Sequence, residues 1–201
     1  MPDLVLGSTT VMSDSTGSVK FTDSVLGNST FPAGHVIQVK GNRSNYDWGS
    51  VGHGNIFDLT WCRVTMTAKQ SGSMFRISGR FTADDTNSSN FGMGMGVKYT
   101  INGGSDVVAI QAPAHEIYQS GGQDTYTTAW MDRLIHNDST MTDSTSPIVP
   151  SSGINPTAGD TIVWTLTSHF NDSNGQYYAG NGPSNTAPWF HTELIVMEIA
   201  K

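Results

Sequence analysis

Apolar and polar residues alternate in many short segments of the chain. In residues 73–82, aromatic and aliphatic side chains alternate with Arg, Ser and Thr. The same period of two residues recurs in 35–40, 63–67, 97–102 and 161–167. Strands with one buried and one wet face give this pattern, which is typical of antiparallel sheets. The alternation therefore predicts an all-β protein.

Residues 193–199 differ from this pattern. Leu194, Ile195, Val196 and Met197 are apolar in succession, as expected for a strand that is covered on both faces. This run predicts a strand that is either central in a sandwich or located where two subunits meet. We take these four residues as candidate subunit-interface residues.

Turns and long polar loops separate the predicted strands. Asn102–Gly103–Gly104 follows one alternating segment and predicts a hairpin turn. Only residues 115–119 and 129–136 are compatible with a helix, and both stretches are short. Many strands joined by long loops predict an antiparallel β-sandwich of the jelly-roll type. The loops that we expect span residues 41–55, 84–96, 136–159 and 171–188.

The beginning of the chain differs in composition from the rest. Residues 1–33 are rich in Gly, Ser and Thr and contain only brief apolar stretches, so they offer little material for a core. We expect them to form an extended N-terminal arm, with a single β-sandwich domain over residues 34–201. Residues 1–10 contain neither a basic segment nor a long apolar stretch, so we expect no signal peptide.

Composition supports strands and narrows the range of partners. Ser, Thr, Asn and Gly make up 81 of the 201 residues, and all four are weak helix formers. The formal net charge is −7, which argues against nucleic acid or an anionic membrane as a partner. No apolar run approaches the ~20 residues that a membrane-spanning helix needs.

No motif for catalysis or for a cofactor is present. The six histidines show neither HxH nor HxxxH spacing, and no phosphate-binding glycine motif or nucleophile motif occurs. Cys62 is the single cysteine and follows Trp61 in a predicted strand, where a small buried hydrophobic residue is expected. We therefore expect no catalytic residues, no metal site and no cofactor.

Aromatic residues in polar loops are the best candidates for ligand binding. An aromatic ring offers a flat apolar face, and neighbouring Asn and Asp offer hydrogen bonds, which together suit a sugar. The alternative is that these rings cover the ends of the core. The candidate binding residues are Tyr46, Trp48, Tyr177, Tyr178 and Trp189.

Two segments carry a resemblance to a known group of proteins. Residues 31–39, FPAGHVIQV, resemble a segment of tail-fibre-like and other virion structural proteins of marine phages, including cyanophages. Residues 194–200, LIVMEIA, resemble the LTLMEIA ending of the same proteins. The resemblance implies a β-sandwich virion component that forms a homotrimer, and it carries over no catalytic residue. Longer loops in 46–55 and 111–159 depart from these proteins, which leaves host range and ligand open.

These observations together predict a phage virion structural protein that is made in the host cytoplasm. A tail fibre or fibre tip that recognises the host surface, through a glycan, is the first interpretation. A head decoration or cement protein that stabilises the capsid is the second. Other virion proteins and further copies of the chain are the expected partners. A carbohydrate-binding module or a glycan-degrading enzyme remains an alternative from another class.

Overall fold

In the computed structural model, every regular element among the described residues is a β-strand. The structure describes residues 4–6, 9–13, 20–21, 33–44, 49–50, 56–85, 91–119, 125–135, 154–170, 175–177 and 192–201. The strands are β1 (Leu4–Leu6), β2 (Thr9–Ser13), β3 (Lys20–Phe21), β4 (Val36–Ser44), β5 (Gly49–Ser50), β6 (Ile56–Thr67), β7 (Met74–Asp85), β8 (Phe91–Ile101), β9 (Val107–Gln119), β10 (Thr125–Ile135), β11 (Thr161–Phe170), β12 (Gly175–Tyr177) and β13 (Thr192–Ile199).

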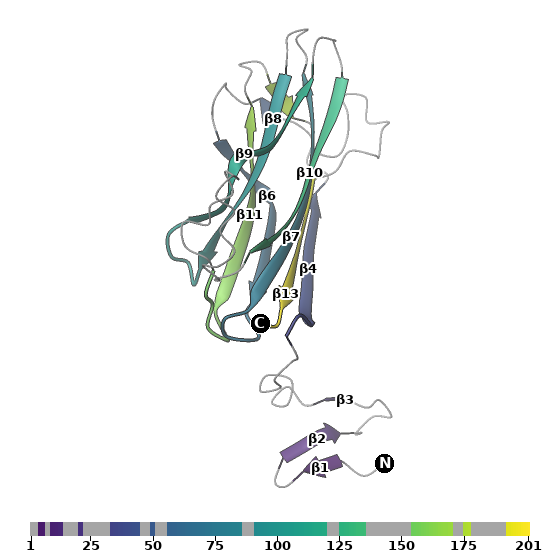
Figure 1. Cartoon of the computed structure of the whole chain (residues 1–201), viewed down its shortest axis with the longest axis vertical. Helices are drawn as coiled ribbons and strands as arrows, with labels where there is room; N and C mark the ends of the chain where they lie inside the picture. Colours follow the sequence, from purple (N-terminus) through teal and green to yellow (C-terminus); the bar gives the residue numbers. More distant parts are fainter. Residues whose placement is uncertain are drawn as a thin grey trace.

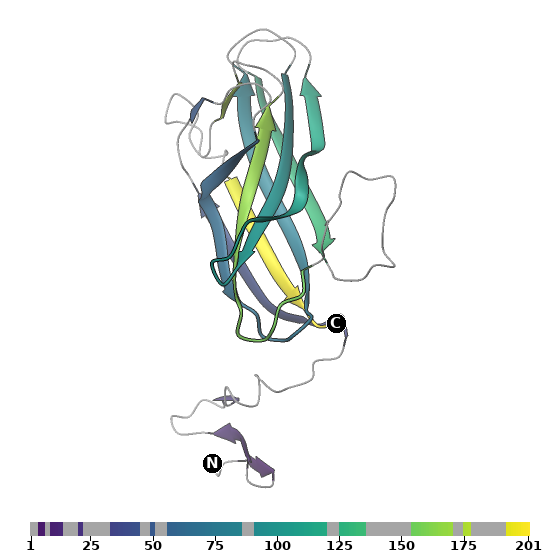
Figure 2. The same cartoon turned by 90° about the vertical axis from the view of Figure 1, so that its left-hand side faces the viewer.

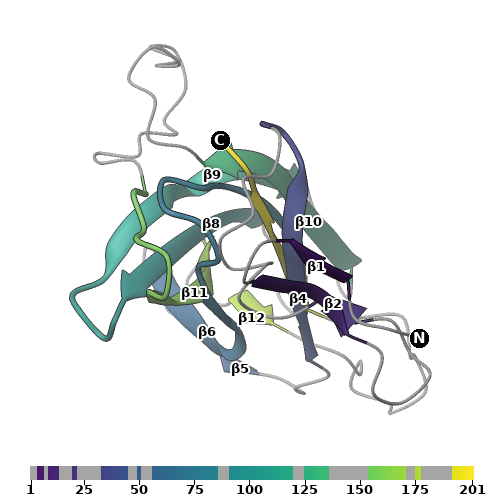
Figure 3. The same cartoon turned by 90° about the horizontal axis from the view of Figure 1, so that it is seen from below.

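The long strands form two antiparallel sheets that pack against each other (Figures 1 and 2). One sheet has the order β4-β13-β7-β10, and the other has the order β6-β11-β8-β9. The short strand β12 pairs with residues 83–85 of β7, on the edge that β13 occupies at residues 74–80, and β5 pairs with β12. Seen from below, the two sheets form two curved layers (Figure 3). This arrangement confirms the predicted all-β, antiparallel sandwich.

The pairing of the eight long strands is that of a jelly roll. In chain order, the first strand pairs with the last, the second with the seventh, the third with the sixth and the fourth with the fifth. Consecutive strands therefore cross repeatedly between the two sheets, as two Greek keys require. The predicted jelly-roll topology is confirmed by this pairing.

The core lies between the sheets and consists of the residues that the alternation assigned to the inner face. Phe75, Ile77 and Phe81 of β7 are fully buried. Trp164 of β11 lies at the centre, with its ring 5.3 Å from the Phe75 ring and 5.1 Å from the Tyr99 ring. Aromatic pairs at such distances contribute beyond the area that they bury. Period-two alternation thus identified the core correctly in these strands.

Strand β13 is central, as its apolar run predicted. It pairs with β4 on one side and with β7 on the other. Leu194 and Val196 point into the core and are fully buried, whereas Ile195 and Met197 are half-buried on the outer face of the sheet. Alternate residues of this apolar run therefore pack in the core, and the others lie at the surface.

The predicted hairpin turn after β8 is confirmed. Asn102 and Gly103 have φ of +52° and +73°, and the amide of Gly104 donates to the carbonyl of Ile101 at 2.9 Å. Two successive positive φ angles define the type I′ turn that joins twisted strands. Gly supplies this backbone conformation at no steric cost, and Asn tolerates it better than most residues.

Several segments that local sequence assigned to loops are strands. Residues 41–44 belong to β4, residues 91–96 belong to β8, and β12 lies within the expected loop 171–188. The two helix-compatible stretches, 115–119 and 129–136, fall in β9 and β10, apart from residue 136, which lies outside the described residues. Pairing with neighbouring strands overrides weak local preference in each case.

Strands β1, β2 and β3 form a separate small sheet. In Figure 1 they lie beyond the lower end of the sandwich, near the side on which β4 begins. The division into an arm at 1–33 and a domain at 34–201 stays a prediction. No helix among the described residues is long and apolar enough to cross a membrane.

Candidate functional site

Exposed apolar side chains are concentrated on one sheet. Six large hydrophobic residues of the described part of the chain are exposed, and four of them belong to the two edge strands of the β4-β13-β7-β10 sheet. These are Val36 and Val39 of β4, 52% and 54% exposed, and Trp130 and Leu134 of β10, 71% and 42% exposed. We call the solvent side of this sheet the outer face.

One half of the outer face is mainly apolar. The strand register places Met197 between Val39 and Arg76, and it places Leu134 on the far side of Arg76. The next row joins Val36, Ile199 and Met74. Neighbouring side chains on one sheet face lie about 5 Å apart, so these residues form a continuous surface. We call Val36, Val39, Met74, Leu134, Met197 and Ile199 the apolar half.

The other half of the outer face centres on Trp130 of β10. Arg80 of β7 lies directly opposite Trp130 in the register, and Glu193 of β13 lies on the far side of Arg80. Thr128 and Thr82, one step further along, share a hydrogen bond at 3.0 Å between their hydroxyl groups. Trp130 is therefore a large exposed apolar ring among polar neighbours.

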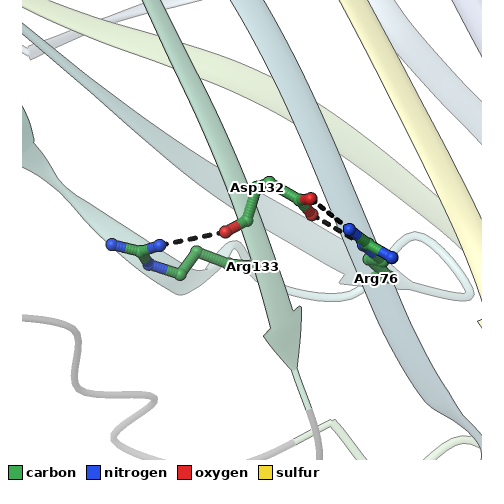
Figure 4. Close-up of polar contacts among 3 residues, drawn as sticks. All are labelled: Arg76, Asp132 and Arg133. Carbon is green, nitrogen blue, oxygen red and sulfur yellow. Dashed lines mark hydrogen bonds and ion pairs between the residues drawn. The ribbon is translucent and has the colours of Figure 1, made fainter.

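An ion pair links the two halves of the outer face. The Arg76 guanidinium binds the Asp132 carboxylate through two nitrogens, with Nε donating to Oδ1 at 2.8 Å (Figure 4). Figure 4 also shows Arg133 extending to the other side of β10, where its Nη1 donates to the backbone oxygen of Asp132 at 3.0 Å. The hydrogen bonds from Arg76 hold the pKa of Asp132 below its ordinary value. A bidentate pair of this kind fixes the geometry of both side chains.

The predicted interface residues divide between the core and the outer face. The side chains of Leu194 and Val196 are buried within one chain. Ile195 and Met197 lie half-buried on the outer face, where Met197 belongs to the apolar half. A contact with another subunit through this run would therefore involve Ile195 and Met197.

The predicted binding aromatics are not brought together by the described residues. Tyr46, Trp48, Tyr178 and Trp189 lie outside them. Tyr177 is in β12, where its backbone pairs with Ala83 and Gly49, and its side chain also lies outside the described part. The loop-aromatic binding site stays a prediction.

Sequence reasoning did not single out Trp130, Arg80 or the Arg76–Asp132 pair. Apolar and polar residues do not alternate clearly in residues 129–135, because the outward Trp130 and Leu134 are as apolar as the inward residues. The one available signal is that Ala129, Met131 and Ile135 are apolar and fall on the same side of a strand, where all three are buried. That period assigns Trp130 to the solvent side and marks it as an exposed aromatic.

The two segments that carry the phage resemblance lie side by side. Val36–Val39 pairs with Met197–Ile199, and the backbone of Gly34 and His35 is joined to Ala200 by two hydrogen bonds of 2.8 Å. Their side chains also meet, since Gln38 Nε2 donates to the fully buried Glu198 carboxylate at 2.5 Å. The two segments thus form one structural unit.

Glu198 fastens the turn between β6 and β7. Its carboxylate accepts hydrogen bonds from the backbone amides of Lys69 and Gln70 at 2.9 and 3.1 Å, and from the hydroxyl of Ser73 at 2.7 Å. Gln38 Nε2 also donates to the backbone oxygen of Thr67 at 2.6 Å. A buried carboxylate with this number of donors is satisfied without a cation. We therefore regard Glu198 as a structural residue.

The described residues contain no group of three or more His, Cys, Asp or Glu side chains that could hold a metal ion. Cys62 is fully buried, as expected, and burial raises the pKa of its thiol to about 12, with Glu193 adding to the effect. A thiol in this state is a poor nucleophile. The outer face is therefore the best-defined candidate site, and its chemistry is that of a contact surface.

No protein-family model matches the sequence, and no curated protein is significantly similar to it. The structure is similar to Eiger TNF from S. frugiperda, with a TM-score of 0.41 and 8% identity over 81% of this chain and 92% of that chain. It is also similar to a structure of infectious bursal disease virus strain Gx, with a TM-score of 0.42 and 14% identity over all of this chain and 37% of that chain. An exo-beta-1,3-galactanase from Phanerochaete chrysosporium matches with a TM-score of 0.20 and 16% identity over 90% of this chain and 30% of that chain. These likenesses carry no argument about function, and the jelly-roll topology rests on the strand pairing.

Proposed function

We propose that the chain is a structural protein of a phage virion that works as a homotrimer. The observation that carries this proposal is the concentration of exposed apolar side chains on the outer face. Large contiguous apolar surface is uncommon on monomeric proteins and marks sites of protein association. A trimer of identical chains would cover these faces.

The phage assignment rests on the resemblance of residues 31–39 and 194–200 to marine phage virion proteins. Their contact through Gln38 and Glu198 gives a physical reason for the two segments to occur together. The first long strand of the sandwich pairs with the last, so both are held in the same sheet. Such a domain suits a particle component that must persist outside the cell. No step of this role needs a catalytic residue or a cofactor.

Within the virion, we propose a place in a tail fibre or fibre tip, where the loops at the ends of the sandwich contact a host-surface glycan. Loops on a rigid β scaffold are common sites of recognition because they vary without disturbing the core. The arm at residues 1–33 would attach the domain to other virion proteins. Decoration of the head is the competing location.

Antibody-gold labelling of intact phage particles that carry this protein tests the proposal. Serum raised against the chain should label the tail, and the same serum absorbed with purified chain serves as the control. Label spread over the head would replace the fibre role with capsid decoration. Purified particles that bind no gold, although the chain is detected in the infected cells, would overturn the virion assignment.

A further inference from the structure

Trp130 is the most exposed of the large hydrophobic residues in the described part of the chain, although it lies in the middle of a strand. Its neighbours Ala129 and Met131 are buried in the core, so the backbone at this position is held firmly. A rigidly presented Trp can bury a large area with little loss of side-chain entropy. Trp and Arg are the residue types most enriched at the energetic centres of protein interfaces.

Arg80 of β7 lies directly opposite Trp130 in the strand register. Arg76, four residues earlier on the same face, is bound by Asp132. Within the described part of the chain, no hydrogen bond or ion pair reaches the Arg80 guanidinium, even though Glu193 lies opposite it in the register. A half-buried guanidinium without an acid favours a partner that brings a carboxylate.

The charge of the chain indicates where such a carboxylate is found. Among the outward positions of the sheet whose side chains the structure describes, the charged residues are Arg43, Arg76 and Arg80 against Asp132 and Glu193, which is a net charge of +1. Since the whole chain carries −7, the remaining residues carry −8. The part of another copy outside its outer face therefore carries a net negative charge.

We infer that Trp130 and Arg80 anchor the contact between neighbouring copies, docking onto a carboxylate-bearing surface elsewhere on the next copy, so that the copies associate head to tail. A face-to-face contact would be isologous and would repeat the same residues on both sides. It would bring two faces together whose carboxylates are already engaged within each chain, since Asp132 binds Arg76 and Glu193 also has an interaction of its own. A head-to-tail contact uses two different surfaces and closes into a ring when its rotation permits, as a trimer requires.

The residues around Trp130 suit the rim of such a contact. Thr128, whose hydroxyl shares a hydrogen bond with the buried Thr82, and Asp132 flank Trp130 along β10, and both are satisfied within the chain. Satisfied polar groups around an apolar anchor exclude water from it without needing partners of their own. The apolar half extends the contact along the same face. This inference rests on the proposed homo-oligomer and specifies its contact.

Sedimentation equilibrium of Trp130→Ala and Arg80→Glu tests the anchor. Loss of a Trp anchor should weaken self-association about 30-fold or more. Arg80→Glu should weaken it further at low salt, because the acidic surface of the next copy would then repel the face. Lys69→Glu is the matched control, since it makes the same charge change at an exposed turn and should leave association unchanged. Circular dichroism and a cooperative thermal transition verify that each variant is folded.

Mixing separates the head-to-tail contact from the face-to-face one. Immobilised wild-type chain should still retain the double variant Trp130→Ala/Arg80→Glu, because the outer face of the wild type can bind the acidic surface that the variant keeps. Immobilised double variant should not retain the double variant. If the wild type retains the double variant no better than the double variant retains itself, the contact is face to face and the inference is wrong.

The remaining outcomes are also decisive. A monomeric wild type would overturn the proposed homotrimer and this inference together. An oligomeric wild type whose mass is insensitive to both substitutions would leave the homotrimer standing and overturn only the anchor. If, in addition, the wild type but not Trp130→Ala binds oligogalacturonate, an acidic saccharide, the occupant of this surface is a glycan and not a second copy.

Discussion

Replacing the buried carboxylate of Glu198 tests how the two ends of the domain are held together. In Glu198→Gln, the side chain keeps its shape, but one carboxylate oxygen becomes an NH₂ group that cannot accept a hydrogen bond. If the remaining oxygen stays toward Gln70 and Ser73, the NH₂ group faces the Nε2 of Gln38, which is also a donor. Gln38 cannot turn over freely, because its Nε2 already donates to Thr67.

The magnitude follows from the bonds that are lost. Buried hydrogen bonds to a charged group contribute about 1.5–3 kcal/mol each, and a buried donor left unsatisfied costs a similar amount. Loss of one such bond, together with weakening of those that remain, predicts a destabilisation of about 2–4 kcal/mol. Glu198→Ala, which leaves the amides of Lys69 and Gln70 and the hydroxyl of Ser73 without an acceptor, should cost more.

Equilibrium urea unfolding at one protein concentration measures the effect, since the stability of an oligomer depends on concentration. Glu193→Gln is the matched control, because it makes the same change on the outer face of the same strand, where about 1 kcal/mol or less is expected. Equal midpoints and slopes for the Glu198→Gln and Glu193→Gln proteins would refute the structural role that we assign to the buried carboxylate.

Three further predictions concern the core and the surface. Cys62 should not react with a thiol reagent at pH 8 until the chain is unfolded, and stability should fall as the pH rises from about 9 toward 12, because only the unfolded chain ionises its thiol there. Gly79→Val should destabilise the domain by about 1–3 kcal/mol in urea unfolding, since a Cβ at Gly79 would already lie 2.9 Å from Cε of Met131, and Gly79→Ala should cost less because that methionine can move. Asp132→Asn should lower stability by less than about 1 kcal/mol at pH 7, because the Arg76 pair is exposed to solvent. Since the pKa of Asp132 is lowered, this difference should be present at neutral pH and vanish as the pH falls through the folded pKa, below the ordinary 3.8.

Local alternation predicted the strands well where one face is buried and the other is polar. Phe75, Ile77 and Phe81 were placed in the core in this way, and all three are fully buried. The pairing of the first strand with the last could not be read from the sequence, because it depends on contacts between residues 160 positions apart. The topology was suggested only by the number of strands and the length of the loops.

The outer face escaped prediction for a physical reason. Surfaces that bind other chains carry apolar residues on the solvent side, so Trp130 and Leu134 remove the contrast on which the alternation rule depends. Glu198 is the opposite case, a charged residue among core residues. It shares its side of β13 with Leu194 and Val196 and is buried with them. An acidic residue in phase with core residues indicates a buried, hydrogen-bonded carboxylate.

The mass of the purified chain in solution tests the central claim most directly. Light scattering coupled to size-exclusion chromatography should give three times the chain mass of 21.6 kDa, without added ligand and across a range of concentrations. Substitution of Trp130 by Ala should shift that mass toward a single chain. A wild-type mass of 21.6 kDa at every concentration would contradict the account, because the exposed outer face would then have no second copy to cover it.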